Sequence, residues 1–526
     1  MSAFKGMRRA AIGWRAWAVI PLLLAVVGCA TGPRPVSPEA ATAEPSVESC
    51  RRWYADLDAL VSRFAVNDAQ DRRIDGFPQL RQSRWTASLR ERAGQSDPAF
   101  EAWMGHMRLL GDQGHAMEIA NVPAQGWRGF WPAEGDAPRA QALARTQVCA
   151  DLLDRDDLVR AERRAGLRAQ PGVPDAYSTL ARWLGVYAIS RWPFGAGVER
   201  WQAETQATFV EHRHAAIAGA VQRYVPMPDT VSNDEAEAIA LAPRDALGVP
   251  ILGGRLSERL LDRHAPVLEI SPQGDFDRLG EMTLAADGSP RVHSARPTVY
   301  RRIAFSRQGG STLVQLVYLF WFSERPKTGP LDLLGGALDG LIWRVTLDEQ
   351  GQPLIYDSIH ACGCYHLFFP TPSLRPKPPP EPGEEWAFVP AKAPRLGAGE
   401  RVVLGIDSRT HYLNAVTSAA DLQGTPYQSL EASDLRSLPI ARADGQGSER
   451  DRRSLYGPDG IVPGSQRGER YFFWPMGVRD AGAQRQWGHH ATAFVGRRHF
   501  DDPDLIERRF ERVDKVPFRS PSETKP

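Results

Sequence analysis

The chain has 526 residues, 64 Lys and Arg against 63 Asp and Glu, a formal net charge of +1, and 42% hydrophobic residues. This length suggests more than one domain, and the composition excludes a disordered or fibrous chain. The arginines are interleaved with acids along the chain. The concentrated basic face that nucleic acid requires is therefore not expected, and we predict no nucleic-acid partner.

The first 28 residues have the pattern of an export signal. They carry four basic residues and no acid, followed by an apolar run over residues 17–27 that one proline interrupts. That run is shorter than the ~20 residues of a spanning helix, which indicates the apolar region of a signal peptide. It ends in Val26-Val27-Gly28-Cys29, which resembles the lipobox of bacterial lipoproteins.

The resemblance implies cleavage before Cys29, a diacylglycerol on its sulfur and usually an acyl chain on its new amino group. Acyl chains, each CH₂ worth about 0.8 kcal/mol when buried, hold a protein on a membrane without a spanning helix. The next residue, Ala30, is not the Asp that resembles an inner-membrane retention signal. We expect the periplasmic face of the outer membrane, with the inner membrane as the alternative. An ordinary cleaved signal beside a chance cysteine is the competing interpretation.

Processing would change the residue counts. Removing residues 1–28 leaves 60 Lys and Arg against 63 Asp and Glu, a net charge of about −3. Once Cys29 is lipidated, an even number of cysteines remains in a compartment where disulfides persist. These disulfide candidates are Cys50, Cys149, Cys362 and Cys364.

The mature chain begins with a tether and continues with a helical segment. Residues 29–47 comprise the lipidated cysteine and a proline-rich tether that can reach up to roughly 50 Å at about 3.1 Å per residue. Over residues 48–240 apolar residues recur at three- and four-residue spacing, which predicts a helical domain whose first helix Ser46 or Ser49 caps. Five tryptophans are expected to pack in the helical core, and a ligand platform is the alternative. They are Trp127, Trp131, Trp183, Trp192 and Trp201.

Residues 241–526 favour strands, with a proline-rich loop over residues 370–383. The run at residues 312–322 is apolar on both faces, which predicts a central strand. The predicted fold class is α+β, a helical N-terminal domain followed by a β-rich, mainly antiparallel C-terminal domain. The other expected strands are residues 267–270, 298–305, 341–347, 401–406, 471–474 and 491–495.

The segment His360-Ala-Cys362-Gly-Cys364-Tyr-His366 is the main chemical candidate. Thiolate and imidazole ligands suit zinc or copper. In an extended strand the two histidines would stand about 20 Å apart at ~3.3 Å per residue, so only a bend at Gly363 could bring the four side chains together.

Four interpretations of this segment stay open. Cys362 and Cys364 form a disulfide while Cys50 pairs with Cys149; the segment binds a metal; one thiol is a nucleophile activated by a histidine; or the thiols are inert packing. Additional ligands could come from His489, His490, His499 and Asp501.

The segment over residues 487–503 has a structural interpretation of its own, which we prefer. In it, Asp501 and Asp502 pair with Arg497 and Arg498 and start a last helix over residues 503–510.

The sequence contains no phosphate-binding loop, no H-E-x-x-H motif and no G-x-S-x-G elbow, so nucleotide-dependent chemistry is not expected and no catalytic residue is assigned. The leading hypothesis is a periplasm-facing, lipid-anchored envelope lipoprotein with a binding role and structural cysteine pairs. Its partner would be an envelope protein or a small molecule. The alternative is an envelope enzyme, or a redox- or metal-handling protein, that works through His360, Cys362, Cys364 and His366.

Overall fold

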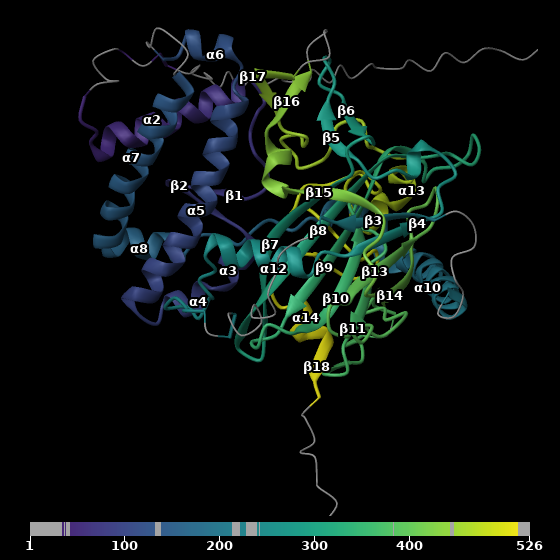
Figure 1. Cartoon of the computed structure of the whole chain (residues 1–526). Coiled ribbons are helices and arrows are strands. Elements are labelled where there is room, and N and C mark those ends of the chain that lie inside the picture. The colour runs from purple at the N-terminus through teal and green to yellow at the C-terminus, as the bar shows by residue number, and fades with distance from the viewer. Residues whose placement is uncertain are drawn as a thin grey trace, which may run out of the picture.

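A computed structural model describes residues 34–35, 37, 43–131, 138–212, 221–227, 239–240, 242–381, 383–441 and 447–513. The predicted signal peptide, Cys29 and most of the tether lie outside these residues. The fold is α+β, with helices mostly in the N-terminal part and a large, mainly antiparallel sheet in the C-terminal part. Figure 1 shows a helical layer at the left of the view and the sheet beside it.

The helical layer begins as the sequence predicts. The Ser46 hydroxyl accepts a hydrogen bond from the Ser49 amide at 3.2 Å, and the Ser49 hydroxyl accepts one from the Ser46 amide at 2.8 Å. This reciprocal capping box satisfies amides that the first helical turn leaves unpaired. The layer consists of α2 (Val47–Arg63), β1 (Arg72–Ile74), β2 (Phe77–Gln82), α3 (Arg84–Ser88), α4 (Arg90–Ala93), α5 (Asp97–Asn121), α6 (Ala124–Arg128), α7 (Pro138–Val159) and α8 (Ala161–Arg168).

A disulfide between Cys50 and Cys149 joins α2 to α7 across 99 residues of sequence. Both cysteines are fully buried in a core with Trp53, Tyr54 and Leu57. The first predicted cysteine pair is therefore present. By the chain-entropy account, a loop of this length stabilises the fold by up to about 4–5 kcal/mol, because the closed loop restricts the unfolded chain.

The large sheet has ten strands in the order β11-β10-β9-β8-β7-β15-β3-β4-β13-β14. Strands β7 to β11 form an antiparallel meander, whereas β15 runs parallel to both β7 and β3 and β13 runs parallel to β4. The bounds are β3 (Gln222–Pro226), β4 (Val267–Ile270), β7 (Thr298–Gln308), β8 (Ser311–Arg325), β9 (Gly336–Leu347), β10 (Pro353–His360), β11 (Leu367–Pro370), β13 (Arg401–Ile406), β14 (Leu413–Ala419) and β15 (Thr425–Glu431).

Strand β8 confirms the prediction of a central strand covered on both faces. Tyr318 and Phe320 belong to the core on one side of the sheet, while Leu319 and Trp321 belong to the core on the other. Side chains alternate between the faces of a strand, so an uninterrupted apolar run fits this position and no other.

Smaller elements surround the large sheet. A second sheet has the order β17-β16-β5-β6, and in the proline-rich loop β12 pairs with β18. The remaining elements are α9 (Thr179–Leu184), α10 (Tyr187–His212), α12 (Gly254–Arg263), η1 (Asp275–Asp277), β5 (Glu281–Leu284), β6 (Pro290–His293), β12 (Leu374–Pro376), η2 (Ala432–Arg436), β16 (Leu438–Ala441), β17 (Gly447–Arg453), α13 (Arg470–Phe473), η3 (Trp474–Met476), α14 (Leu505–Arg509) and β18 (Phe510–Arg512).

The sheet recruits elements from the first half of the chain. Strand β3 lies in the segment expected to be helical, yet it sits between β15 and β4 near the middle of the sheet. Helices α9 and α10 pack against η3, and α10 also packs against β14. The helices that pack on one another as a separate layer are therefore those up to α8.

Two of the expected strands are wrong. Residues 471–474 lie in α13 and η3, because backbone amides of Phe472 and Phe473 bond to the Glu469 carbonyl and Pro475 follows at once. Residues 491–495 form an irregular loop, in which only an isolated bridge links Ala491 to His499. Both runs are short and aromatic or apolar, a pattern that helices, strands and packed loops share.

The helical layer meets the sheet layer through a buried ionic network. The Asp68 carboxylate accepts hydrogen bonds from Arg436 of η2 at 2.6 and 3.1 Å and from Arg81 of β2 at 3.2 Å. Arg81 also contacts Glu118 of α5 at 2.7 Å. Burial raises the pKa of Glu118, but Arg81 and Arg73 outweigh it and hold that pKa at about 2.

His115 of α5 lies beside this network and should make the fold sensitive to acid. Burial, helped by Arg81, lowers its pKa to about 3 from an ordinary value of 6.5. The unfolded chain therefore binds a proton between pH 6.5 and 3 that the folded protein excludes, and stability falls as the pH falls through this window.

We predict that His115→Phe reduces the pH dependence of the free energy of unfolding by about 1.4 kcal/mol per pH unit between pH 6 and 4. Urea titrations at several pH values measure this slope. Replacement of the exposed His293 is the control and should leave the slope as it is in the native chain. An unchanged slope in His115→Phe would contradict the assignment.

Candidate functional site

The segment from His360 to His366 forms a tight turn between β10 and β11. Gly363 has a φ of +96°, its amide bonds to the His360 carbonyl at 2.7 Å, and the His360 amide bonds to the Cys364 carbonyl at 2.9 Å. A Cβ at Gly363 would lie 2.6 Å from the Ala491 carbonyl oxygen, so only glycine fits here. The bend that a shared site would require is therefore present.

The bend does not bring the two histidines together. His360 Nδ1 lies 3.6 Å from Asp339, whereas His366 Nε2 lies 2.9 Å from Asp357, which Arg344 also binds at 2.8 Å. His360 shares a sheet face with Tyr356, and His366 lies on the opposite face with Asp357 because side chains alternate along the hairpin. Across the described ranges, no three ligands drawn from the proposed metal site and its additional ligands come within metal-binding distance.

Cys362 and Cys364 are free thiols, so the second predicted disulfide is not formed. A three-residue C-x-C ring is strained, and here the turn leaves the thiols hydrogen-bonded to each other instead. That hydrogen bond lowers the pKa of Cys362 and, with burial, raises the pKa of Cys364 well above its usual range.

The surroundings of His360 are buried and closely packed. Asp339 accepts hydrogen bonds from Arg467 at 3.1 Å and pairs with His411 at 2.9 Å. Burial raises the pKa of Glu469, next to this cluster, to about 7. The cavity beside His360, Tyr365 and Tyr412 has a volume of only ≈ 20 Å³. A space of this size holds about one water, so substrate has no room beside these residues.

The additional candidates each have other partners. His489 Nε2 lies 2.7 Å from the Ala69 carbonyl, and His490 is buried against Phe500. His499 Nε2 lies 3.1 Å from Asp175. These contacts place the three rings in separate surroundings.

The preferred pairing of Asp501 and Asp502 with Arg497 and Arg498 is wrong. Asp501 binds Arg84, while Arg497 pairs with Asp175 and Arg498 with Glu385. The loop packs against α3 and against residues 174–177, so its partners come from distant sequence. The last helix is confirmed as α14, shorter than expected.

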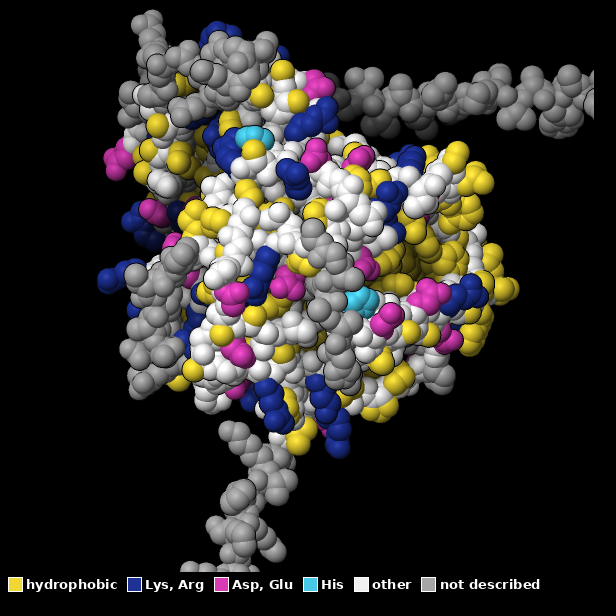
Figure 2. Space-filling view, turned by 45° about the vertical axis from the view of Figure 1, so that its right-hand side comes forward, with side chains coloured by type: hydrophobic (Ala, Val, Ile, Leu, Met, Phe, Trp, Pro, Cys, Tyr) yellow, Lys and Arg dark blue, Asp and Glu magenta, His cyan; other side chains and the backbone are white. Residues whose placement is uncertain are grey.

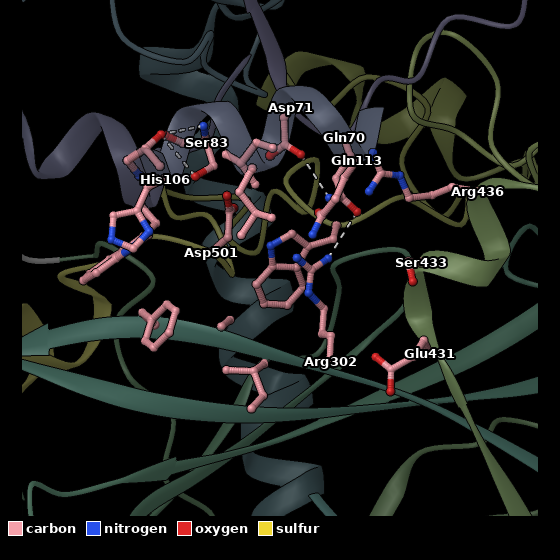
Figure 3. Close-up of a pocket in the computed structure, with 18 residues that line it drawn as sticks. Gln70, Asp71, Ser83, His106, Gln113, Arg302, Glu431, Ser433, Arg436 and Asp501 are labelled. Carbon is pink, nitrogen blue, oxygen red and sulfur yellow. Dashed lines mark hydrogen bonds between the residues drawn. The ribbon is translucent and has the colours of Figure 1, made fainter. Parts of the chain in front are cut away.

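Asp501 instead belongs to a cleft of ≈ 290 Å³ between the helical layer and the sheet (Figure 3). Helices α3 and α5 form one wall, β7 and η2 form the other, and the loop at residues 487–501 lies between them. The cleft is lined by Gln70, Asp71, Ser83, Trp85, Thr86, His106, Leu109, Leu110, Gln113, Arg302, Ile303, Ala304, Phe305, Glu431, Ser433, Arg436, Trp487 and Asp501.

Aromatic rings and an arginine define the apolar part of the cleft. The Arg302 guanidinium lies 4.5 Å from the Trp487 ring centroid and donates to Gln70 Oε1 at 3.2 Å. Burial lowers the pKa of Arg302 to about 10. The Trp85 ring lies 5.5 Å from Phe305. Within the part of the chain that the structure describes, Trp85 Nε1 and Arg302 Nε are buried donors without an acceptor.

Two carboxyl groups of the cleft have contrasting surroundings. Both Asp501 oxygens accept from Arg84 Nη1 at 3.0 Å, so a cation compensates this carboxylate. Asp71 accepts from Gln70 Nε2 at 3.0 Å, and burial raises the pKa of Asp71. Figure 3 shows both residues among the side chains that surround the cleft.

Among the residues of this cleft, the sequence singled out Asp501 as a candidate, either as an additional metal ligand or, in the preferred interpretation, as an ion-pair partner of Arg497 or Arg498. Asp71, Trp85, Arg302 and Trp487 come from segments separated by up to hundreds of residues, with no local motif to connect them. The signal that could have drawn attention is Trp487, an aromatic residue in a polar loop that contains two neighbouring histidines.

A further three-ligand cluster, Asp58 with His115 and Glu118, lies in the helical layer. Arg73 and Arg81 bind its carboxylates, with Arg73 2.7 Å from Glu118. These guanidinium groups supply the positive charge that a metal ion would otherwise bring, so we assign the cluster to the layer interface.

Comparison with protein-family models, with curated proteins and with solved structures found no match to this chain. Within the described ranges, none of the helices combines the length and the apolar character needed to cross a bilayer.

We predict that Cys50, Cys149, Cys362 and Cys364 make up one disulfide and two free thiols. Alkylation under denaturing, non-reducing conditions followed by peptide mapping should recover a cross-linked Cys50–Cys149 pair and alkylated Cys362 and Cys364. Metal analysis of the same sample should find no stoichiometric zinc or copper, since the two histidines face different aspartates. A Cys362–Cys364 cross-link, or bound metal lost in Cys362→Ser, would contradict this arrangement.

Proposed function

We propose that the protein is a periplasm-facing, lipid-anchored envelope protein that binds a small, hydroxyl-rich ligand of the saccharide class in the cleft between its two layers. The observation that carries the proposal is the cleft itself, where side chains that donate hydrogen bonds and side chains that accept them surround Trp85 and Trp487. Its volume of ≈ 290 Å³ lies near the lower end of the ~300–1,000 Å³ typical of ligand sites.

The chemistry of the lining favours such a ligand over others. Amide groups of Gln70 and Gln113 and hydroxyls of Ser83 and Ser433 can both donate and accept, as sugar hydroxyls do. A phosphate would face the carboxyl groups of the cleft, and an acyl chain would leave its many polar atoms unpaired.

A second candidate is hydrolysis of the same ligand class. The favouring observation is that two carboxyl groups of the cleft have different surroundings, since burial raises the pKa of Asp71 whereas Asp501 is paired with Arg84, and such a difference suits proton transfer. In this second candidate function, Asp71 would donate the proton. Turnover that Asp71→Asn abolishes while binding persists would favour this second candidate.

The membrane part of the proposal is supported by the sequence, through the basic N-terminus, the short apolar run and Cys29. We predict that cells supplied with an alkyne-tagged fatty acid incorporate the tag into the native protein and not into Cys29→Ala. The control Cys364→Ala changes another unbridged cysteine and should keep the tag. Tag retained in Cys29→Ala would contradict lipidation at this residue.

The ligand proposal is tested by blocking the cleft without disturbing the core. Gln113 lines the cleft from α5 and is exposed, so Gln113→Trp should place a ring in the entrance and leave stability unchanged. Gln147→Trp, at an exposed position of α7 outside the cleft, is the matched control.

The probes are a panel of neutral mono- and disaccharides, with inorganic phosphate and oleate as comparison ligands, and binding is measured by saturation-transfer NMR. We expect saccharide signals with the native chain and with Gln147→Trp, and a loss of at least about tenfold in affinity, or 1.4 kcal/mol, with Gln113→Trp. Equal binding by both variants, or binding of phosphate or oleate alone, would overturn the proposal.

A further inference from the structure

One face of the molecule exposes a concentration of large apolar side chains. Trp183 is 75% exposed, Ile189 70% and Trp192 60%, although the sequence pattern placed both tryptophans in the core. We call this face the apolar patch. Its members are Leu180, Trp183, Leu184, Val186, Ile189, Trp192, Leu331, Leu333, Tyr471, Phe472 and Trp474, all exposed in the structure.

The apolar patch is continuous although its parts are far apart in sequence. Helices α9 and α10 pack against η3, and the Ser178 amide bonds to the Gly477 carbonyl at 2.8 Å. The Leu333 carbonyl accepts a hydrogen bond from the Glu469 amide at 3.1 Å, which joins the turn that carries Leu333 to the start of α13. Figure 2 shows hydrophobic side chains gathered along its right-hand side, the side on which Figure 1 places α10 and α13.

The backbone beneath the patch is firmly held. Arg182 belongs to α9 and is buried. Its Nε donates to the Met476 carbonyl at 2.8 Å and its Nη2 to the Gly496 carbonyl at 2.6 Å. Its guanidinium also lies over the rings of Tyr177 and Tyr187 at 4.6 and 4.4 Å. The exposed side chains are therefore presented by fixed helices and do not belong to a frayed segment.

Arginines border the patch. Arg191 lies 5.0 Å from the Trp192 ring and Arg470 lies 4.8 Å from the Tyr471 ring. Arg470 also pairs with Asp480, and the nearby Asp332 is an anion whose pKa the backbone hydrogen bonds of its own turn hold at about 2.

Tryptophan, tyrosine and aliphatic side chains bordered by arginine suit the boundary between lipid headgroups and acyl chains. Anionic headgroups complement the arginines, since basic residues close to such a surface are attracted to it. An apolar surface of this extent on a protein in water marks an interaction site.

We propose that the apolar patch docks into the surface of a bilayer that contains anionic lipid. This inference rests on the membrane placement proposed above and goes beyond it by adding a second contact. The acyl chains expected at Cys29 attach only the end of the tether, so the patch would add a contact from the folded part itself. The tether, up to roughly 50 Å long, allows the folded part to reach the same membrane.

The test is quenching of tryptophan fluorescence by vesicles of phosphatidylcholine and phosphatidylglycerol whose acyl chains carry bromine. The full chain is compared with Trp183→Ser/Trp192→Ser and with the control Val159→Ser/Ile251→Ser, whose positions are exposed but outside the patch. All three proteins keep Cys29. We expect the control to be quenched like the native chain and the tryptophan variant to lose at least half of the quenched signal.

Equal quenching of all three proteins would overturn the proposal. Dimers of the native chain in sedimentation that become monomers in the tryptophan variant, without any lipid quenching, would also overturn it and assign the patch to a second copy. Unfolding curves of each variant confirm that the fold is retained. Because lipidation at Cys29 is read separately by fatty-acid labelling, failure of that proposal leaves this result interpretable.

Discussion

The two layers depend on one buried carboxylate. Asp68 follows α2 and is bound by Arg436 and Arg81, and Gln486 Nε2 adds a third contact at 3.0 Å. Arg81 belongs to β2 of the helical layer, whereas Arg436 belongs to η2 and Gln486 to the loop before Trp487, so a single side chain connects the helical layer to η2 and to this loop. A charge buried this deeply is stable only while its partners are present, and loss of one typically costs about 3–5 kcal/mol.

The cleft is built on the same segments. Gln70 and Asp71 lie two and three residues after Asp68, Trp487 follows Gln486, and Arg436 itself lines the cavity. The network therefore sets the distance between the walls before any ligand arrives. A site fixed in this way avoids the entropy cost of ordering its side chains on binding. The proposed function and the stability of the layer interface are thus two consequences of one arrangement.

The sequence predicts the features that depend on local pattern. A capped first helix, the doubly buried strand β8 and the α+β class follow from spacing and periodicity, and the Cys50–Cys149 pair matches one of the pairings that the even cysteine count allows. It does not predict that β3 joins the sheet, because a five-residue strand between segments of mixed pattern carries little signal of its own. It also misplaces Trp183 and Trp192, since apolar spacing shows that a helix has an apolar face but not what covers that face.

The proposed thiol and imidazole site shows the same limit more sharply. The bend at Gly363 that a shared site would require is present, yet the alternation of the hairpin sends His360 and His366 to opposite faces. The cleft, in contrast, collects residues from α3, α5, β7, η2 and the loop at residues 487–501, a combination fixed by tertiary packing alone. Long-range partners such as Arg84 for Asp501 cannot be read from spacing along the chain.

The most direct test of the account is a double-mutant cycle between Asp68 and Arg436, with the free energy of unfolding measured by urea titration. We expect Asp68→Asn alone to destabilise the fold by about 3–5 kcal/mol, and the two changes together to cost at least about 1 kcal/mol less than the sum of the single changes. Single changes that each cost under about 1 kcal/mol and add without coupling would contradict a layer interface held by this carboxylate.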